Sequence, residues 1–335
     1  MRAAFGSEEG ACVVTCNATA GLAACLISHA IEGSVLVPAF TFPASASAVL
    51  MAGAEPLVVD VDRQTWAVSA ELLDEALGVS KAAAAMVVAP FGIKQDFREH
   101  IEICRRHNAL LVIDNAAGLG VRRQHVENTP GVLEVYSMHA TKPFGVGEGG
   151  VIFMNKAHEE RVRAALNFAL RTHDRAEGPH WGINGKMSEF HAAIGLAQMQ
   201  SYKLQGQARQ LVVNRYANVL SKFSDLTYPL DVSSSPWQFF PVLLPSAKAA
   251  ARLIACGAQS GLEIRNYYRP SLSVWPGLQC SHPCPVSEDL SERMCCLPVY
   301  SDAVETELDE ILEIAVRAIE SSLDFRREKD PECHT

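Results

Sequence analysis

The first half of the chain alternates short apolar runs with longer amphipathic segments. Short, continuous apolar runs predict strands that are buried on both faces, as in a parallel sheet. These runs are Ser34–Val37, Pro56–Val59, Ala84–Ala89, Leu110–Ile113, Glu134–Met138 and Gly150–Met154. The amphipathic segments predict helices at Thr19–Ala30, Ala44–Met51, Ala70–Leu77 and Phe97–His107. Successive strand–helix–strand units predict an α/β fold with a mainly parallel sheet.

The rest of the chain has a different pattern. Two long helices are predicted first, Ala157–Leu170 and Met187–Leu220, the second broken near Gly206. After them the pattern predicts the strands Gln238–Leu243 and Leu262–Tyr267 and the helices Ala247–Ser260, Ser287–Cys296 and Thr306–Ser322. Ser233–Pro236 predicts a linker. We therefore expect a large domain at residues 1–232, a smaller α+β C-terminal domain at 233–325 and a frayed tail at 326–335.

Composition narrows the functional classes. Of the 335 residues, 48% are hydrophobic and 20% are charged, and this balance excludes a disordered chain. The net charge of −9 disfavours a nucleic-acid partner. No apolar run reaches the roughly 20 residues of a membrane span, so no membrane partner is expected. Ten scattered cysteines are typical of a protein in the reducing cytoplasm rather than of a disulfide scaffold.

Asp114 is the first residue that the predicted sheet singles out. Ligands of an open parallel sheet bind beyond the carboxyl ends of its strands. Asp114 directly follows the predicted strand Leu110–Ile113, so its carboxylate would face a ligand crevice. A carboxylate there can equally cap the next helix, and its position alone does not decide between the two roles.

Lys142 lies just after another predicted strand, in the stretch YSMHATKPFGVGEGG. Four glycines follow it within a few residues (Gly145, Gly147, Gly149 and Gly150), which indicates a tight backbone with little side-chain cover. A lysine in such a crevice can be desolvated, and the resulting neutral amine can attack a carbonyl group. The alternative is a surface lysine beside a turn. The glycines do not have the spacing of a phosphate-binding P-loop.

The start of the first long helix, Asn17-Ala18-Thr19-Ala20, is the third feature. Free backbone N–H groups at a helix N-terminus form an anion site, although the same residues can be an ordinary helix cap. A helix N-terminus for phosphate, the carboxylate of Asp114 and the amine of Lys142 together form the set that pyridoxal 5′-phosphate (PLP) requires. The phosphate would lie on the helix, the carboxylate would keep the pyridine nitrogen protonated, and the lysine would hold the aldehyde.

At these motifs the sequence resembles the DegT/StrS family of sugar-nucleotide aminotransferases. The matching stretches are CNATAGL (16–22), VPAFTFPASASAVLMAGAEPLVVDVD (37–62), VIDNAAGLG (112–120), YSMHATKPFGVGEGG (136–150), GINGKMSEFHAAIGLAQM (182–199) and GLEIRNYYRPSL (261–272). They follow the order of the family and cover nearly the whole chain. The resemblance implies the aspartate-aminotransferase (type I) fold, with a mainly parallel, seven-stranded type of sheet in the large domain and a smaller C-terminal domain.

The resemblance also implies roles for particular residues. Lys142 would bind the cofactor aldehyde and later shuttle the proton, and Asp114 would pair with the pyridine nitrogen. The cofactor phosphate would be held by Ser137, Thr19 and the backbone around Ala18 and Ala20. Phe42 would stack on the ring. Asn184 would reach the phosphate from the neighbouring subunit, so a homodimer with active sites at its interface is expected.

Several of these residues could instead have a purely structural role. Phe42 lies in an apolar run and could belong to the core, and Asn184 could be a turn residue. His139, Glu148 and Lys186 lie in matching motifs without a settled role. No metal site is expected, because Cys280, His282 and Cys284 do not have a standard zinc spacing.

Three departures from the family pattern bear on the site. Ala18 stands where relatives usually have glycine, which could tighten the phosphate loop. Ala117 stands where relatives often have Gln or His near the cofactor's 3-hydroxyl group. The chain begins close to its first motif, whereas relatives usually carry an N-terminal arm that helps to line the substrate pocket. The absence of this arm before the first motif puts substrate binding in question more than cofactor binding.

The predicted function is a PLP-dependent aminotransfer to a nucleotide-linked keto sugar, with glutamate as the expected donor. The HATK form of the lysine motif resembles the branch that aminates C4 of 4-keto-6-deoxy sugars. The pathway would be deoxyamino-sugar synthesis for a surface polysaccharide or a glycosylated antibiotic. Two alternatives stay open: a dehydratase of the same family that uses pyridoxamine phosphate, against which Lys142 argues, and a regulator or scaffold that binds PLP without turnover.

Overall fold

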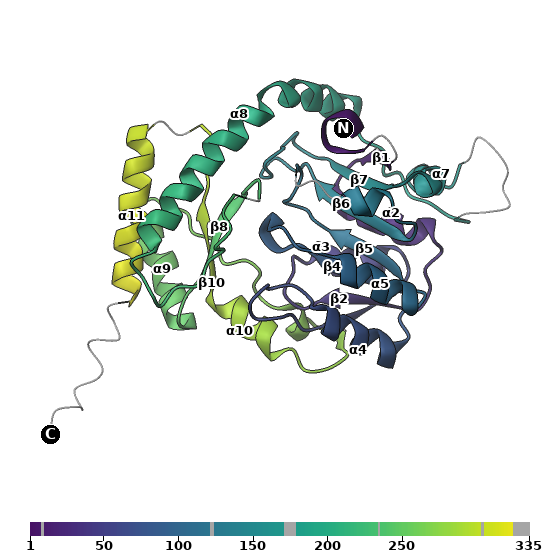
Figure 1. Ribbon diagram of the computed structural model, residues 1–335, viewed down its shortest axis with the longest axis horizontal. Helices are drawn as coiled ribbons and strands as arrows, with labels where there is room; N and C mark the ends of the chain where they lie inside the picture. The colour runs from purple at the N-terminus through teal and green to yellow at the C-terminus, as the bar shows by residue number, and fades with distance from the viewer. Residues whose placement is uncertain (8–9, 121–123, 171–178, 234, 303–304, 324–335) are drawn as a thin grey trace.

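The computed structural model describes residues 1–7, 10–120, 124–170, 179–233, 235–302 and 305–323. Within these ranges eight strands form one sheet in the order β1-β7-β6-β5-β4-β2-β3-β9 (Figure 1). Their bounds are β1 Gly10–Thr15, β2 Ser34–Pro38, β3 Glu55–Val59, β4 Ala84–Val88, β5 Leu110–Asp114, β6 Val132–Ser137, β7 Gly150–Asn155 and β9 Gln279–Cys280. Only β7 pairs antiparallel with its neighbours. The predicted α/β fold with a mainly parallel sheet is confirmed.

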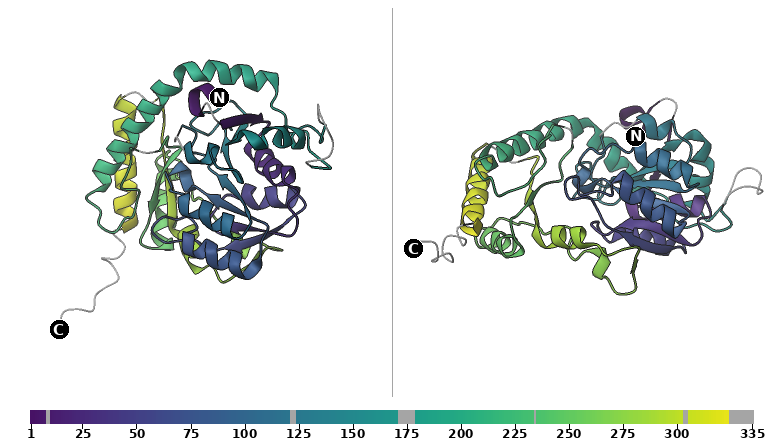
Figure 2. Two further views of the ribbon diagram at one scale, coloured as in Figure 1. Left: turned by 45° about the vertical axis from the view of Figure 1, so that its right-hand side comes forward. Right: turned by 60° about the horizontal axis from the view of Figure 1, so that its bottom comes forward.

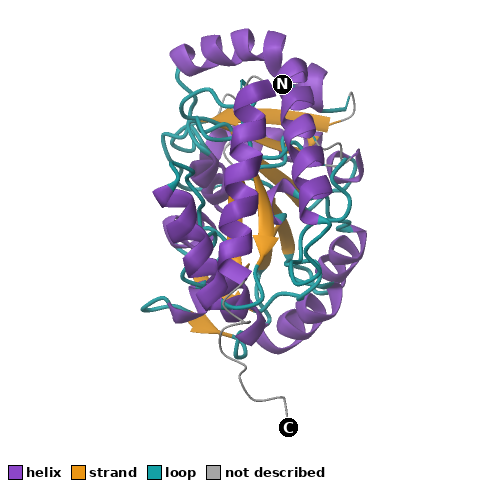
Figure 3. Cartoon of the chain, turned by 90° about the vertical axis from the view of Figure 1, so that its left-hand side faces the viewer, coloured by secondary structure: helices purple, strands orange, loops and turns teal. Residues whose placement is uncertain are grey.

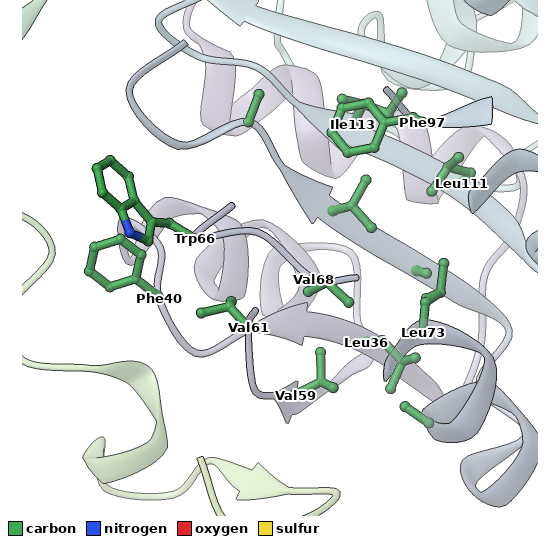
Figure 4. Close-up of a cluster of buried hydrophobic side chains, with 14 of the residues drawn as sticks. Leu36, Phe40, Val59, Val61, Trp66, Val68, Leu73, Phe97, Leu111 and Ile113 are labelled. Carbon is green, nitrogen blue, oxygen red and sulfur yellow. The ribbon is translucent and has the colours of Figure 1, made fainter. Parts of the chain in front are cut away.

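Helices cover both faces of this sheet. One face carries α2 (Ala18–Ser28), α3 (Ala44–Met51) and α7 (Glu159–Ala165), and the other carries α4 (Ala70–Ser80) and α5 (Arg98–Arg106). Side chains alternate along a strand, so β5 contributes Leu110 and Val112 to the first face and Leu111 and Ile113 to the second. Figure 4 shows the core of the second face, where Leu111 and Ile113 lie near Phe97. Asp114 continues the alternation and falls on the side of α2 and α3.

A second, smaller unit packs around a core of its own. Its two strands, β8 (Phe239–Leu243) and β10 (Met294–Pro298), pair antiparallel. The helices α9 (Ala247–Gln259) and α11 (Glu305–Leu323) pack on them together with the C-terminal part of α8 (Glu189–Leu220). Figure 2 shows this unit beside the large sheet, with α8 running from one to the other, and Figure 3 views the molecule from the side of the smaller unit. The remaining helical segments are α1 (Arg2–Phe5), η1 (Pro90–Gly92), α6 (Gln124–Glu127), η2 (Lys156–His158), η3 (Leu272–Val274) and α10 (Pro285–Arg293).

The division into residues 1–232 and 233–325 stays a prediction, and contacts cross it in both directions. Tyr216 of α8 is fully buried in the core of the smaller unit. Conversely, β9 extends the large sheet by pairing with β3. The predicted tail at 326–335 and Ser234 of the predicted linker lie outside the described residues.

Two predicted elements of the last third were wrong in extent or type. The helix predicted at Ser287–Cys296 ends at Arg293, because the apolar run that follows forms the buried strand β10; periodicity cannot distinguish a short buried strand from a helix. The strand predicted at Leu262–Tyr267 is reduced to one bridge, between Arg265 and Cys296. The segment then turns and lines the cavity described below.

The two predicted long helices also differ from expectation. The predicted break near Gly206 does not occur: α8 is continuous, since one glycine costs a helix only about 1 kcal/mol and its C-terminal part is packed. The helix predicted at Ala157–Leu170 is shorter: α7 ends at Ala165, and Phe168 and Ala169 have left-handed backbone conformations. In the part of the chain that the structure describes, no helix is both long and apolar enough to cross a membrane.

Candidate active site

A cavity of about 420 Å³ lies at the carboxyl ends of the central parallel strands. Its walls include Val88 of β4, Asp114 of β5 and Ser137 of β6, each the last residue of its strand, as the rule for open parallel sheets predicts. The N-terminus of α2 and the loop that carries Lys142 close one side. The smaller unit supplies a further wall, and the residues that it contributes are Gln238, Phe239, Arg265, Tyr267 and Tyr268.

Lys142 is the amine of this cavity. Its Nζ donates a hydrogen bond to Oε1 of Gln238 at 2.8 Å. Burial lowers the pKa of Lys142 to about 8, an effect that the negative charge of Asp114 partly offsets. The alternative of an exposed lysine beside a turn is therefore wrong, and the amine is partly neutral near pH 7 to 8, as a nucleophile or base must be.

Asp114 is a buried carboxylate that faces the same cavity. It accepts hydrogen bonds from the Ser45 hydroxyl (2.8 Å to Oδ2) and from the backbone N–H of Ala116 (3.2 Å to Oδ1). Burial raises the pKa of Asp114, while Ser45, Lys142 and Ala116 act in the opposite direction. A cationic partner that enters the cavity, such as a protonated ring nitrogen, would relieve this cost of burial.

The N-terminus of α2 points its free end at the cavity. Asn17 is the N-cap, and its Oδ1 accepts the N–H of Ala20 at 2.8 Å. Asn17, Ala18 and Thr19 line the cavity together with Ser137, whereas Ala20 does not. Ala20 therefore differs from the other predicted phosphate ligands in two ways: it lies outside the cavity wall, and its N–H is already bonded to the side chain of Asn17.

Gly150 shows why glycine is needed beside this helix end. A Cβ at Gly150 would lie 2.5 Å from Oγ1 of Thr15 and 2.8 Å from the backbone nitrogen of Ala18. Both separations are below any normal contact, so a side chain would push β7 and the start of α2 apart. The glycine run therefore lets the sheet approach the predicted phosphate site closely.

The other predicted residues divide into two groups. Phe42 lines the cavity with 53% of its surface exposed, and its ring meets Tyr267 edge-on. The alternative that it belongs to the core is wrong. Asn184 is exposed and does not line the cavity; its Oδ1 accepts a hydrogen bond from Lys186 at 2.7 Å. Its predicted role through a neighbouring subunit stays a prediction.

Three residues of the site were not singled out by sequence. Ser45 reaches Asp114, Gln238 reaches Lys142, and Phe91 donates its backbone N–H to the Tyr268 hydroxyl while stacking on that ring. Nothing in a single sequence marks Ser45 or Gln238, since each depends on a contact between distant segments. The segment GLEIRNYYRPSL (261–272), which resembles the family, contributes Arg265, Tyr267 and Tyr268 to the cavity wall.

Comparison with known proteins decides the family. The sequence pattern of the DegT/DnrJ/EryC1/StrS aminotransferase family matches residues 3–316. The chain belongs to this family. Protein Rv3402c of Mycobacterium tuberculosis H37Rv is 28% identical over 284 residues, which are 79% of this chain and 67% of that protein.

Solved structures agree with the family and the fold. A protein of Bacillus cereus ATCC 10987 described as a PLP-dependent aminotransferase is 25% identical with a TM-score of 0.82, and the match covers 94% of this chain and 88% of that one. DesI, solved in the presence of its TDP-sugar product, has a TM-score of 0.82 at 24% identity, over 95% and 83% of the two chains. A DegT/DnrJ/EryC1/StrS aminotransferase of Brucella abortus has a TM-score of 0.79 at 23% identity, over 91% and 84%.

PLP is accordingly the cofactor, as the sequence predicted. The cavity fits it on observations of its own: an amine whose pKa is lowered, a buried carboxylate that accepts hydrogen bonds from a hydroxyl and a backbone N–H, an exposed aromatic ring and a helix N-terminus. Ala117 lines the cavity with an apolar side chain, so it offers no hydrogen bond to a cofactor hydroxyl. The described residues contain no cluster of three or more His, Cys, Asp or Glu side chains that could hold a metal.

Proposed function

We propose that this protein is a PLP-dependent aminotransferase that moves an amino group from glutamate to a nucleotide-linked keto sugar. The observation that carries the proposal is the meeting of Lys142, Asp114 and the N-terminus of α2 in one cavity. An amine that is partly neutral, a carboxylate suited to a cation and an anion site are the three functions that PLP chemistry asks of a protein. The same cavity offers further walls from the smaller unit for a second reactant.

Each residue has a definite task in this proposal. When bound, PLP supplies an electron sink and carries the amino group between the two half-reactions. Lys142 would hold the cofactor aldehyde and, once released from it, would take the proton from the donor Cα. Asp114 accepts a hydrogen bond from the pyridine nitrogen and keeps it protonated. Phe42 lies where it can cover the ring, and Ala18, Thr19 and Ser137 bind the phosphate.

Arg265 supports an amino-acid donor. Its guanidinium lies on the cavity wall next to the rings of Phe239 and Tyr267, and its Nη1 donates to the Tyr267 hydroxyl at 3.1 Å. Its Nε donates to Glu263, which leaves the far edge of the planar group for another carboxylate. A guanidinium suits that task, because it offers paired N–H donors to the two oxygens of a carboxylate.

The sugar substrate is inferred from relatives. DesI was solved with its TDP-sugar product, and PseC of Helicobacter pylori takes part in the biosynthesis of pseudoaminic acid. At 24% and 19% identity these similarities establish the fold, so the substrate, amination at C4 and a deoxyamino-sugar pathway are proposals. A dehydratase is the weaker alternative because Lys142 is present, and a non-catalytic binder is disfavoured because the complete set of groups lines one cavity.

We further propose a cytoplasmic homodimer. Large apolar side chains are exposed along the segment that leads into α8 and along α8 itself: Trp181 is 85% exposed, Phe190 84% and Leu196 72%. Such a surface is typical of an interface. Asn184 lies in the same segment, so a partner placed there would bring it toward a neighbouring cavity. All cysteines among the described residues are free thiols, which fits a reducing compartment.

The test starts from purified protein with added PLP. Reduction with borohydride followed by peptide mass mapping should place the cofactor on Lys142. Addition of glutamate should bleach the visible band and release 2-oxoglutarate, and a panel of nucleotide-linked keto sugars should restore the band. Lys142→Ala should abolish the adduct, whereas the exposed Lys94→Ala should leave it unchanged. An adduct on another lysine, or full turnover by Lys142→Ala, would refute the proposal.

A further inference from the structure

A side chain from the smaller unit holds the Lys142 amine. Gln238 directly precedes β8, lies 96 residues after Lys142 in the chain and is only 8% exposed. Its Oε1 accepts the hydrogen bond from Nζ at 2.8 Å. A buried amide acceptor beside the amine of a half-buried lysine is a specific arrangement, because a polar group is costly to bury without a partner.

Neighbouring contacts fix which end of the amide faces the lysine. Nε2 of Gln238 donates to Oγ1 of Thr141 at 3.2 Å, so Oε1 is turned toward Lys142. The Thr141 hydroxyl also lies 3.0 Å from Nδ1 of His139, which accepts the backbone N–H of Thr141. Thr141 can therefore donate to His139 and accept from Gln238 at once. A flipped amide would place its NH₂ group against the protonated form of the amine, which has no lone pair to accept a hydrogen bond.

The backbone before Gln238 is held as firmly as its side chain. Trp237 is fully buried, has a left-handed backbone (φ +53°) and donates its indole N–H to the carbonyl of Val232 at 2.8 Å. Nη1 of Arg209 donates to the carbonyls of Trp237 at 3.0 Å and Val299 at 3.1 Å. A left-handed backbone is unfavourable for a residue with a side chain, so these contacts secure a conformation that delivers Gln238 to the cavity.

We propose that Gln238 is a positioning residue for Lys142. It receives the amine when the donor displaces Lys142 from the cofactor aldehyde, and it keeps that amine beside the donor Cα. With one N–H bound to the amide oxygen, the lone pair of the neutral amine points away from Gln238 and into the cavity. This inference rests on the proposed function. It explains why the partner is an amide: a carboxylate there would favour the protonated amine and weaken it as a base.

The first test uses the cofactor-free protein and does not depend on turnover. Reductive methylation of Lys142 with formaldehyde, followed by mass spectrometry across a pH series, reports the titration of the amine. Gln238→Glu should raise the midpoint by about one pH unit or more, because a negative charge stabilises the ammonium form. Gln64→Glu, on an exposed loop, is the matched control and should leave the midpoint unchanged. An unchanged midpoint in Gln238→Glu would overturn the placement.

The second test follows a single half-reaction of the PLP-loaded protein with glutamate and with α-deuterated glutamate. Gln238→Ala should slow the reaction about 10- to 100-fold, within the range of a positioned proton transfer. It should also increase the deuterium isotope effect and leave the cofactor Kd within about twofold of the wild-type value. Thr141→Val, which removes the acceptor that orients the amide, should slow the reaction in the same direction by a smaller factor.

The outcomes separate this inference from the proposed function. If the wild-type protein forms no lysine adduct and gives no half-reaction, the proposed function fails. If the wild-type protein reacts and Gln238→Ala reacts at the same rate with the same isotope effect, only the role of Gln238 fails. A slower reaction explained entirely by weaker cofactor binding or a lower melting temperature would also overturn the positioning role, because it would indicate a structural one.

Discussion

Helix α2 has a group of buried titratable side chains at each end, and the two groups differ in one respect. At its N-terminus, Asp114 and Lys142 share an open cavity. At its C-terminus, the capping residue His29 packs against His158, with Nε2 of His29 3.0 Å from Nδ1 of His158. Burial shifts the pKa of every member toward its neutral form: it is raised for Asp114 and lowered for Lys142 and both histidines.

The histidine pair is fully satisfied within the protein. Gly131 donates its N–H to Nε2 of His158 at 2.9 Å, so a neutral His158 carries its proton on Nδ1 and donates it to His29. His29 then carries its proton on Nδ1, which lies 3.0 Å from the carbonyl of Cys25. Within the described part of the chain, the carboxylate of Asp114 accepts hydrogen bonds only from neutral donors, and it faces a cavity that a ligand can fill. A shifted pKa therefore does not mark a site; a shifted pKa beside a cavity does.

The largest effect that this comparison predicts is the loss of reaction rate when Asp114 is substituted. Asp114→Asn keeps the shape of the side chain but removes the charge that pairs with a protonated pyridine nitrogen. We expect the glutamate half-reaction to slow about 10²- to 10⁴-fold, as for loss of a charged group that acts in the transition state. Stopped-flow absorbance of the PLP-loaded protein measures this rate.

The matched control for Asp114→Asn is Asp74→Asn. Asp74 lies on α4 and binds Arg106 and His107 at the surface, away from the cavity. Its substitution should leave the half-reaction rate within about twofold of wild type, since surface substitutions away from a site have small effects. If Asp114→Asn reacts as fast as Asp74→Asn, the ring nitrogen has another partner and the assignment of Asp114 is wrong.

The second predicted effect is a loss of stability at acid pH, and it comes from His29 at the C-terminus of α2. Burial lowers the pKa of His29 to about 4, so below pH 6.5 the unfolded chain binds a proton that the folded chain does not. Stability from this group is present above pH 6.5 and is lost as the pH falls toward 4. Between pH 6.5 and 5 we expect a loss of about 2 kcal/mol in the free energy of unfolding. Urea unfolding of the cofactor-free protein across this range measures it.

His29→Gln removes the titrating group and keeps polar atoms that can face His158. The variant should lose less stability than wild type between pH 6.5 and 5, although it can be less stable at pH 7. His158 and the nearby Arg161, whose charge also lowers the pKa of both imidazoles, remain unchanged in this variant. Equal losses in the two proteins would show that His29 does not set the acid sensitivity.

A feature of this molecule could be predicted from the sequence when it depends on residues that are close together in the chain. The parallel strands were predictable, since runs such as Leu110–Ile113 are apolar at every position and are covered on both faces. Asp114 and Lys142 were predictable because each lies at or shortly after the carboxyl end of a strand. The resemblance to the DegT/StrS family then supplied the cofactor, which strand ends alone do not identify.

The contributions from the smaller unit could not be predicted in the same way. Gln238 meets Lys142 only after α8 and the start of β8 are packed, and no periodic pattern encodes that distance. The run from Met294 to Pro298 is short and apolar, so the pattern did not reveal that it changes from helix to strand. The continuity of α8 past Gly206 likewise depends on tertiary packing rather than on local propensity.

The smallest predicted effect is the pH dependence of stability that Asp114 causes. It sharpens the comparison, because its sign is opposite to that of the pH dependence predicted for His29. Burial raises the pKa of Asp114 above 3.8, so above pH 3.8 the folded, cofactor-free chain holds a proton that the unfolded chain has released. Stability from this group is present at low pH and is lost as the pH rises through the raised pKa. Relative to Asp114→Asn, the wild-type protein should therefore gain unfolding free energy as the pH falls through the raised pKa of Asp114. Urea unfolding of both proteins without PLP gives this difference, in which the contribution of His29 cancels. Bound PLP should abolish the gain, because a protonated ring nitrogen keeps Asp114 ionised; a gain that persists with PLP bound would place the nitrogen elsewhere.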